Sequence, residues 1–430
     1  MTEYVQSPAV SLPNAVVMIR SGIEADKPQT DAKLLSSLPT AVRVLELGPP
    51  DSLIGPAYCE KHPSAQWLRV NPEAATLATV EGTFDLLVCS HGLPSSQVLE
   101  LASSKVSTGA TLHAAVDNGA SWSALANIIE GDLDAFDAPL SPASAYKRLL
   151  DAGWMPTIAD QHPAMPPTTG LAECAAPIAD TLGVPRRTAD RTLGMARIIV
   201  QAVRRFDDQP RGTGRALFSV VVPTTRETQL RANVERSPGL QEVQAQVISY
   251  RGARSPAEAL SQSSAHCDSD WVLFCHQDVY FPKGFGEHLN AVLASVPVEA
   301  RQNALFGFVG MGLNRSTLAC EPAGFVIDRL HRADHPQSDA ALSIDELAIV
   351  VARESVHRID PMLGWHLWAT DLCLAAICTH RTFPTILRLP IFHNSSNDYV
   401  LPESFQDAAR LLKCKYPDFG PIHTLCGIIK

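Results

Sequence analysis

Short apolar runs alternate with longer amphipathic stretches in both halves of this chain of 430 residues. The alternation is typical of βα units around a mostly parallel sheet, whose buried strands are near-continuous apolar runs. In the first half these runs are residues 42–47, 67–70, 84–89, 111–116 and 197–203. In the second half they are residues 218–222, 246–250, 271–275, 304–309, 347–352 and 385–392. We therefore predict an α/β fold with a Rossmann-like sheet in each half.

A polar segment separates the two halves. Residues 207–214, DDQPRGTG, place charge, proline and glycine between two apolar runs, which is a linker pattern. A chain of this length also exceeds what one hydrophobic core usually serves. The sequence therefore predicts two domains, residues 1–210 and residues 215–430.

Composition narrows the class of protein. A net charge of −10 argues against a general nucleic-acid binder, which would carry a basic stripe. The ten cysteines occur singly, without a CxxC pair, as in reduced cytoplasmic proteins. The N-terminus lacks a signal-peptide pattern, and no apolar run approaches the ~20 residues that cross a bilayer. We expect a cytoplasmic protein that can still contact the inner membrane face peripherally.

Polar residues follow the apolar run 271–275 abruptly, and they include Asp278. In open α/β sheets, ligands bind beyond the carboxyl ends of the strands. A carboxylate there can hold a divalent cation that neutralises phosphate oxygens. An aspartate in this position also caps turns and helices, and the segment alone leaves both roles open.

Six motifs in the second half occur in an order that carries a family resemblance. They are FSVVVPT (218–224), CHQDVYFP (275–282), FVIDRLHR (325–332), SIDEL (343–347), IDPMLGWHLWATDLCL (359–374) and PIFHNS (390–395). Together they resemble the family-2-type glycosyltransferases of the GT-A fold, in a branch whose metal motif reads His-Gln-Asp. The resemblance spans nearly all of residues 218–396. It implies transfer of a sugar from a nucleotide-sugar donor to an acceptor hydroxyl, with inversion.

The resemblance assigns a metal site and a general base. Asp278 and His393 match the metal ligands, and an imidazole ligand favours Mn²⁺ somewhat over Mg²⁺. Asp371 matches the carboxylate that takes the proton of the acceptor hydroxyl. From the residues alone, His393 is more often a hydrogen-bonded loop histidine. The alternative for Asp371 is a helix carboxylate stabilised by the macrodipole.

The nucleotide-sugar site is the next implication of the resemblance. Its expected members are Pro223, Thr224, Arg226, Glu227, Arg254, Gln277 and Asp278. Many relatives bind the base with an aspartate after the second strand, but here residues 249–252 read SYRG and contain no acid. The identity of the base therefore stays open. Arg254 either reaches the diphosphate or is a solvated loop arginine.

The acceptor side is expected to contain Trp365, His366, Asp328 and Arg329, the last two on a loop. Trp365 and Trp368 suit either stacking on a sugar ring or packing in the core. The acceptor that the resemblance implies is a glycan or a lipid-linked glycan of the bacterial surface.

Residues 41–204 resemble, more loosely, a class I S-adenosylmethionine-dependent methyltransferase. The matching segments are VRVLELGPP (42–50), FDLLVCSH (84–91), YKRLLDAGW (146–154) and ARIIV (196–200). The cofactor turn of such enzymes needs several glycines, but this chain has Gly48 followed by two prolines. The second strand lacks its terminal acid, for which Asn71 is a weak substitute.

We therefore expect a methyltransferase-like domain without catalysis and without bound S-adenosylmethionine, serving in docking or homo-oligomerisation. Two alternatives remain for the whole chain. One is a bifunctional methyltransferase and glycosyltransferase. The other is a non-catalytic scaffold that binds nucleotide sugars.

Overall fold

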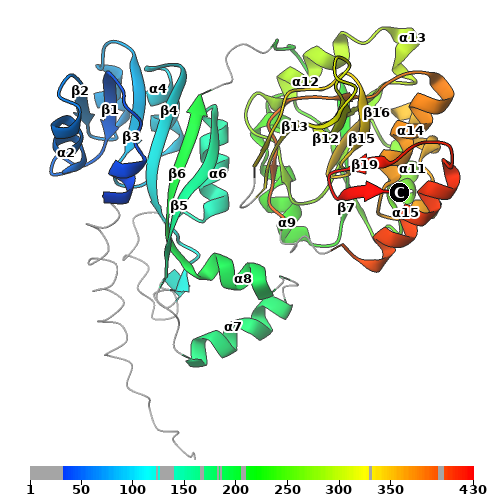
Figure 1. Cartoon of the computed structure of the whole chain (residues 1–430), viewed down its shortest axis with the longest axis horizontal. Helices are drawn as coiled ribbons and strands as arrows, with labels where there is room; N and C mark the ends of the chain where they lie inside the picture. The colour runs from blue at the N-terminus through cyan, green and yellow to red at the C-terminus, as the bar shows by residue number, and fades with distance from the viewer. Residues whose placement is uncertain are drawn as a thin grey trace, which may run out of the picture. The chain divides into compact units, whose positions relative to one another are not determined.

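The computed structural model describes residues 32–122, 124–125, 140–164, 169–181, 184, 186–204, 210–328, 332–395 and 401–430. The chain divides into two compact units, coloured along the chain in Figure 1. Unit 1 comprises Met1–Ala145 and Ile158–Arg204, and unit 2 comprises Tyr146–Thr157 and Arg205–Lys430. The predicted linker, residues 207–214, thus begins shortly after the end of unit 1.

The first sheet has the strand order β2-β1-β3-β4-β6-β5. Strands β1 to β4 are parallel to one another, and β6 is antiparallel to β4. The strands are β1 Arg43–Leu47, β2 Gln66–Val70, β3 Phe84–Cys89, β4 Val106–Asp117, β5 Trp154–Pro163 and β6 Met195–Arg204. The five predicted runs of the first half lie on β1, β2, β3, β4 and β6. Only β5, which has polar residues among its apolar ones, was not predicted.

The described helices of the first half include α2 Ile54–Lys61, α3 Ala74–Ala78, α4 Ser96–Ser103, α6 Pro142–Asp151, α7 Thr169–Thr181 and α8 Arg186–Leu193. One core cluster of unit 1 joins Ile54 and Tyr58 of α2 to buried residues of β1, β3 and β6. Helix α4 begins after Ser95, whose hydroxyl accepts a hydrogen bond from the backbone N–H of Val98. These features produce a Rossmann-like α/β sheet.

Unit 2 contains a sheet of order β17-β11-β16-β9-β7-β8. Its strands are β7 Phe218–Thr224, β8 Val247–Arg251, β9 Trp271–Cys275, β11 Leu305–Gly307, β16 Ala348–Ala352 and β17 Thr385–Ile386. Strands β8, β7 and β9 are parallel, whereas β16 is antiparallel to β9. The carboxyl ends of three neighbouring strands therefore meet at one edge.

A second sheet in unit 2 contradicts the prediction of a mostly parallel arrangement. Its order is β10-β18-β13-β12-β15, with β14 beside β13. The strands are β10 Val279–Tyr280, β12 Val309–Leu313, β13 Cys320–Asp328, β14 Arg332–Asp334, β15 Ala341–Ile344 and β18 Phe392–His393. Most neighbours are antiparallel.

Glycine and polar residues explain why this sheet was missed. Gly324 on β13 has φ +91°, and a Cβ there would lie 2.1 Å from the carbonyl oxygen of Phe308. Such positions break the apolar runs by which buried strands are predicted. The predicted runs 304–309 and 385–392 accordingly divide, the first between β11 and β12 and the second between β17 and β18.

Helices cover both faces of the first sheet of unit 2. They are α9 Glu227–Ala232, α10 Pro238–Gln241, α11 Pro256–Ser264, α12 Phe285–Ala294, α13 Val298–Arg301, α14 Trp368–His380 and α15 Glu403–Lys415. Residues of α11, α14 and α15 share one core cluster, and residues of α9, α10 and α12 share another. A terminal hairpin follows, β19 Ile422–Thr424 and β20 Gly427–Ile429.

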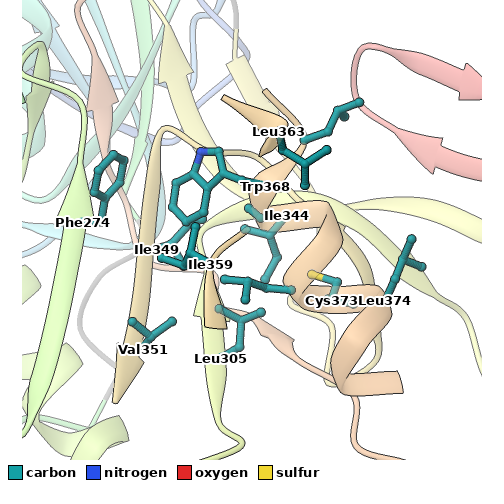
Figure 2. Packing of buried hydrophobic residues seen from close by; sticks show 14 of the residues in the cluster. Phe274, Leu305, Ile344, Ile349, Val351, Ile359, Leu363, Trp368, Cys373 and Leu374 are labelled. Atoms are coloured by element: carbon teal, nitrogen blue, oxygen red, sulfur yellow. The ribbon is translucent and has the colours of Figure 1, made fainter. Parts of the chain in front are cut away.

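Helix α14 is anchored by Trp368, which is 1% exposed. Its ring lies edge-on to Phe274 of β9, with ring centroids 5.0 Å apart (Figure 2). Trp368 is therefore a core residue, one of the two roles that the sequence left open. Because β9 leads directly into the motif with Asp278, this packing also ties α14 to the strand that positions the site.

None of the helices within the described ranges is both long enough and apolar enough to span a membrane. The nine cysteines described are all free thiols.

Candidate metal and nucleotide site

The candidate site lies just after β9, where the chain passes from one sheet of unit 2 to the other. Strand β9 ends at Cys275, and residues 276–278 lead into β10 of the second sheet. In that sheet Val279 is paired with His393, and Asp328 is also paired with His393 on the other side. The register thus brings Asp278, which precedes Val279, and Asp328 to opposite sides of one histidine.

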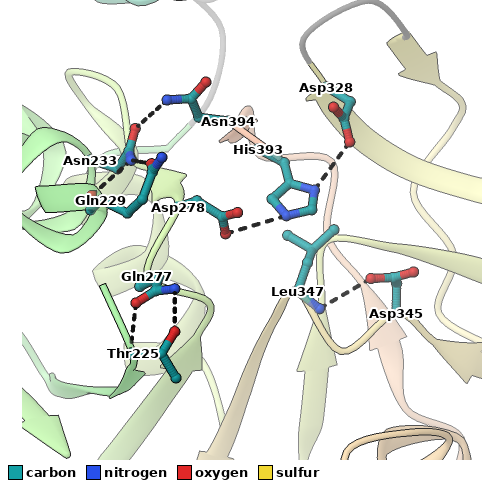
Figure 3. Close-up of polar contacts among 10 residues, drawn as sticks. All are labelled: Thr225, Gln229, Asn233, Gln277, Asp278, Asp328, Asp345, Leu347, His393 and Asn394. Carbon is teal, nitrogen blue, oxygen red and sulfur yellow. Dashed lines mark hydrogen bonds and ion pairs between the residues drawn. The ribbon is translucent and has the colours of Figure 1, made fainter. Parts of the chain in front are cut away.

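His393 lies between two carboxylates (Figure 3). Its Nε2 is 3.4 Å from Oδ1 of Asp278, and its Nδ1 is 3.1 Å from Oδ2 of Asp328. The ring of His276 lies nearby, with its centroid 5.8 Å from that of His393. None of the three ion-pair partners is more than 20% exposed. The charges are therefore only partly screened by water.

The electrostatics follow from this arrangement. Burial favours the neutral form of Asp278, but His393 outweighs it and lowers the pKa of the carboxyl. Burial would lower the pKa of His393, yet Asp278 and Asp328 raise it well above the ordinary value. For His276, burial prevails and lowers the pKa. In these contacts two carboxylates face the single imidazole of His393.

The donor atoms of His276, Asp278 and His393 all lie within 4.8 Å of one another. One carboxylate and two imidazoles suit a borderline divalent ion such as Mn²⁺ better than Ca²⁺, which prefers oxygen. The residues present therefore fit a divalent metal. The structure brings together the two predicted ligands, Asp278 and His393. It adds His276, which sequence reasoning had quoted in the motif without a role.

Gln277 braces the loop that follows β7. Its Oε1 accepts hydrogen bonds from the backbone N–H groups of Thr225 and Arg226, at 2.9 and 2.8 Å. Its Nε2 donates to the hydroxyl of Thr225. Thr224 is buried, and its hydroxyl donates to the carbonyl of Val222. The expected nucleotide contact of Gln277 remains a prediction, because these polar atoms already have partners within the protein.

Two charged residues of the predicted nucleotide site, Glu227 and Arg254, pair with neighbours outside that set. Glu227 accepts from Arg251, the last residue of β8. Arg254 pairs with Glu258, whose pKa this pair lowers. Pro223 lies on β7, opposite Tyr250 of β8. These residues all lie at or just beyond the carboxyl ends of β7 and β8, and their contact with a nucleotide stays a prediction.

Asp371 lies in the first turn of α14 and is 1% exposed. One carboxylate oxygen accepts from Lys415 Nζ and the other from Tyr416 Oη, each at 2.8 Å. Lys415 also donates to Asp360. The role of general base stays a prediction. To act as a base, the carboxylate must exchange one of these donors for an acceptor hydroxyl.

The acceptor-side residues have different surroundings in the structure. Trp365 is 38% exposed, and His366 is partly buried against Phe405, with its pKa lowered by burial. Asp328 belongs to β13 rather than to a loop, because its segment pairs with β14 and β18. Arg329 lies outside the described residues.

Glu346 is a candidate that sequence reasoning did not assign. Burial, and then the charge of Asp345, raise its pKa to about 8. Its carboxylate accepts hydrogen bonds from the backbone N–H groups of Leu367 and Ala369 at the start of α14. The SIDEL motif was the only signal for it.

Unit 1 presents a different arrangement at the corresponding edge of its sheet. Glu46 of β1 is completely buried, and its Oε2 accepts from Trp67 Nε1 at 2.8 Å and Arg69 Nε at 2.7 Å. The same guanidinium donates to the carbonyl oxygens of Pro50 and Ser52. Arg69 therefore binds the turn after β1, where a methyltransferase-like fold would place its cofactor.

Gly48 lies in the same turn, and neighbouring side chains pack closely against its Cα. A Cβ at Gly48 would lie 1.9 Å from Ser90 Oγ and 3.2 Å from Glu46 Oε1. Asn71, the weak substitute for the missing acid, donates to Glu73 on the surface. The side chains of Arg69 and Ser90 thus lie against the turn, and the absence of bound S-adenosylmethionine stays a prediction.

No protein-family model matches this chain, and no curated protein matches its sequence. Solved structures do match, and most of the examples are methyltransferases resembling the N-terminal part, about 45% of the chain. One is a SAM-dependent methyltransferase from Archaeoglobus fulgidus. It is 14% identical and covers 44% of this chain and 99% of its own, with a TM-score of 0.30.

Two further structures have TM-scores of 0.27. A SAM-dependent methyltransferase from Thermotoga maritima, described as a possible histamine N-methyltransferase, is 10% identical and covers 44% of this chain and 97% of its own. The YcgJ protein of Bacillus subtilis is 9% identical and covers 43% of this chain and 100% of its own. These are likenesses of fold alone. The chain is an α/β protein with a Rossmann-like sheet in its N-terminal half and further mixed sheets beyond it.

Proposed function

We propose that unit 2 is a metal-dependent glycosyltransferase of the GT-A type, which moves a sugar from a nucleoside-diphosphate donor to an acceptor hydroxyl. The observation that carries the proposal is the convergence of His276, Asp278 and His393 within 4.8 Å. They converge beside the carboxyl ends of the parallel strands β8, β7 and β9, where open α/β sheets bind nucleotides. The six ordered motifs favour the same function.

The protein groups have separate tasks in this proposal. A divalent cation bound by His276, Asp278 and His393 would neutralise the charge that develops on the departing diphosphate. Gln277 holds the loop after β7 against the start of the metal motif, and so fixes the floor of the nucleotide site. Asp371 takes the proton of the acceptor hydroxyl once Lys415 or Tyr416 no longer donates a hydrogen bond to its carboxylate.

The same proposal gives unit 1 no reaction of its own, because Arg69 donates to two carbonyls of the turn at which an adenosyl group would bind. Docking or homo-oligomerisation is its proposed role. For unit 2 we propose a glycan or a lipid-linked glycan as the acceptor, reached in the cytoplasm or at the inner membrane face.

The decisive experiment is calorimetric titration of the full chain with UDP, GDP, CDP and dTDP, each with and without Mn²⁺. We expect one nucleotide to bind, and to bind more tightly with the metal. Asp278→Ala should remove the metal dependence, whereas Asp268→Ala, at the opposite end of β9 and exposed, should retain it. Failure of every nucleotide to bind, with or without Mn²⁺, would refute the proposal.

A second candidate is a protein that binds a nucleotide sugar without transferring it. The burial of Asp371 and its two bonded donors favour this alternative. Asp371→Asn distinguishes the two functions. A transferase loses turnover and keeps nucleotide affinity, whereas a binding protein shows no donor-dependent transfer in either form.

A further inference from the structure

Asp328 lies beside the candidate metal centre without belonging to its donor set. It ends β13, and β13 runs parallel to β18, with Asp328 paired to His393 in register. Its Oδ2 is 3.1 Å from Nδ1 of His393. The group of side chains close enough to share one ion comprises His276, Asp278 and His393, but not Asp328.

We propose that Asp328 is a positioning residue, which holds the ring of His393 so that Nε2 faces Asp278 and the bound metal. This inference rests on the metal site of the proposed function. It also changes the role expected for Asp328, from an acceptor contact to a support of the metal ligand.

The chemistry of imidazole provides the reason. A neutral imidazole has one N–H donor and one lone-pair nitrogen, and the partner of the first nitrogen determines which role the second takes. When Nδ1–H donates to Asp328, the lone pair is on Nε2, on the side of Asp278 (Figure 3). Carboxylates that orient metal-binding histidines in this way typically contribute about 10- to 100-fold to metal affinity.

The backbone strengthens the arrangement. Because β13 and β18 are neighbouring strands, the spacing between Asp328 and His393 is fixed by sheet hydrogen bonds rather than by a loop. On the other side, β10 fixes Asp278 by its pairing with β18, and the N–H of Asn394 donates to the carbonyl of Asp278 at 2.8 Å. His393 is thus held by both neighbours of β18.

The test is Mn²⁺ binding to the full-length protein without nucleotide, measured by electron paramagnetic resonance. We expect Asp328→Ala to weaken Mn²⁺ binding by about 10- to 100-fold. Asp328→Asn should weaken it less, because its amide oxygen still accepts the Nδ1 hydrogen bond. Asp334→Ala is the matched control. Asp334 lies on the adjacent strand β14, is similarly buried, and binds Arg332 and Arg388 instead of a histidine.

Two outcomes would overturn the proposal, and they separate it from the proposed function. If Asp328→Ala binds Mn²⁺ like the wild type while Asp278→Ala does not, the metal site stands and Asp328 has no positioning role. If Asp278→Ala also binds Mn²⁺ normally, the metal site itself is wrong, and both proposals fail.

A second measurement does not depend on the folding of a variant. In the wild-type protein loaded with Zn²⁺, ¹⁵N NMR of the His393 ring should show a protonated Nδ1 and a metal-bound Nε2. A metal on Nδ1 would contradict the inference directly.

Discussion

Carboxylates with little exposure to water lie at a sheet edge in each unit, and their charge is balanced by different cations. In unit 1 the buried carboxylate of Glu46 is paired with Arg69, whose guanidinium also satisfies two carbonyls of the turn. In unit 2 Asp278 and Asp328 share His393 between them. Arginine keeps its charge at any physiological pH, whereas an imidazole can lose its proton and bind a metal. At the first edge a permanent cation pairs with Oε2 of Glu46, although Oε1 has no hydrogen-bond partner among the described residues. The second edge is suited to receive a cation.

The largest expected effect comes from breaking the pair in unit 1. Arg69→Ala leaves the fully buried Glu46 without its cation, which typically costs about 3–5 kcal/mol of folding free energy. Differential scanning calorimetry should show a clearly lower melting temperature for unit 1. The double variant Glu46→Gln with Arg69→Met should recover most of the loss, since it leaves no buried charge. A single variant that melts like the wild type would show that the pair is not what holds this edge closed.

The next effect is expected from adding a cation. Mn²⁺ at about 100 times its Kd should stabilise the unit that binds it by about 2.7 kcal/mol. We expect the shift in the unit 2 transition alone, and its absence in Asp278→Ala. Stabilisation of unit 1 by Mn²⁺, or of Asp278→Ala to the same extent, would contradict the difference between the two edges.

The sequence predicts the buried strands that lead to the two sheet edges better than it predicts the second sheet of unit 2. The runs 84–89 and 271–275 coincide with β3 and β9, because a fully buried strand must be apolar throughout. The second sheet of unit 2 was not foreseen, since Gly310, Gly312 and Gly324 interrupt its strands. Its existence decides the site, because β10, β13 and β18 bring distant residues to His393.

The site residues too could be chosen from the sequence, but their arrangement could not. Asp278 and His393 could be chosen by resemblance, but their proximity depends on a two-residue pairing of β10 with β18 that no local pattern predicts. His276 and Asp328 were visible in the motifs, and their roles required the register. The filling of the unit 1 turn by Arg69 was likewise invisible, since an arginine in a half-exposed strand carries no signal of its partner 23 residues away.

Two histidines, one buried and one partly buried, extend the comparison to pH. Burial lowers the pKa of His113 on β4 to about 4, from an ordinary value of 6.5. Its Nδ1 contacts Ser37, and its Nε2 has no hydrogen-bond partner among the described residues. The unfolded chain therefore binds a proton first, so unit 1 loses stability as pH falls from 6.5 towards 4. His393, with its pKa raised, has the opposite sign and contributes stability that is lost as pH rises through its folded value.

Lowering the pH from about 7.5 to about 5 should cost unit 1 about 2 kcal/mol through His113. The measurement is the difference between the wild type and His113→Gln in calorimetric unfolding at the two pH values. Equal pH dependence in both proteins would show that His113 is protonated without penalty.

The smallest effect is expected at Arg254. Like Arg69, it is an arginine paired with a glutamate, but unlike Arg69 it is exposed. The side chain of Arg254 is 87% exposed, against 22% for Arg69. Exposed ion pairs contribute little because water and salt screen them. Arg254→Ala should therefore leave the melting temperature of unit 2 unchanged. If Arg254 turns from Glu258 to the diphosphate, the same variant weakens nucleotide binding by less than about tenfold, the range of an exposed charge contact. A large loss of stability would show that exposure does not separate the two arginines, and that the contrast between the two edges has another cause.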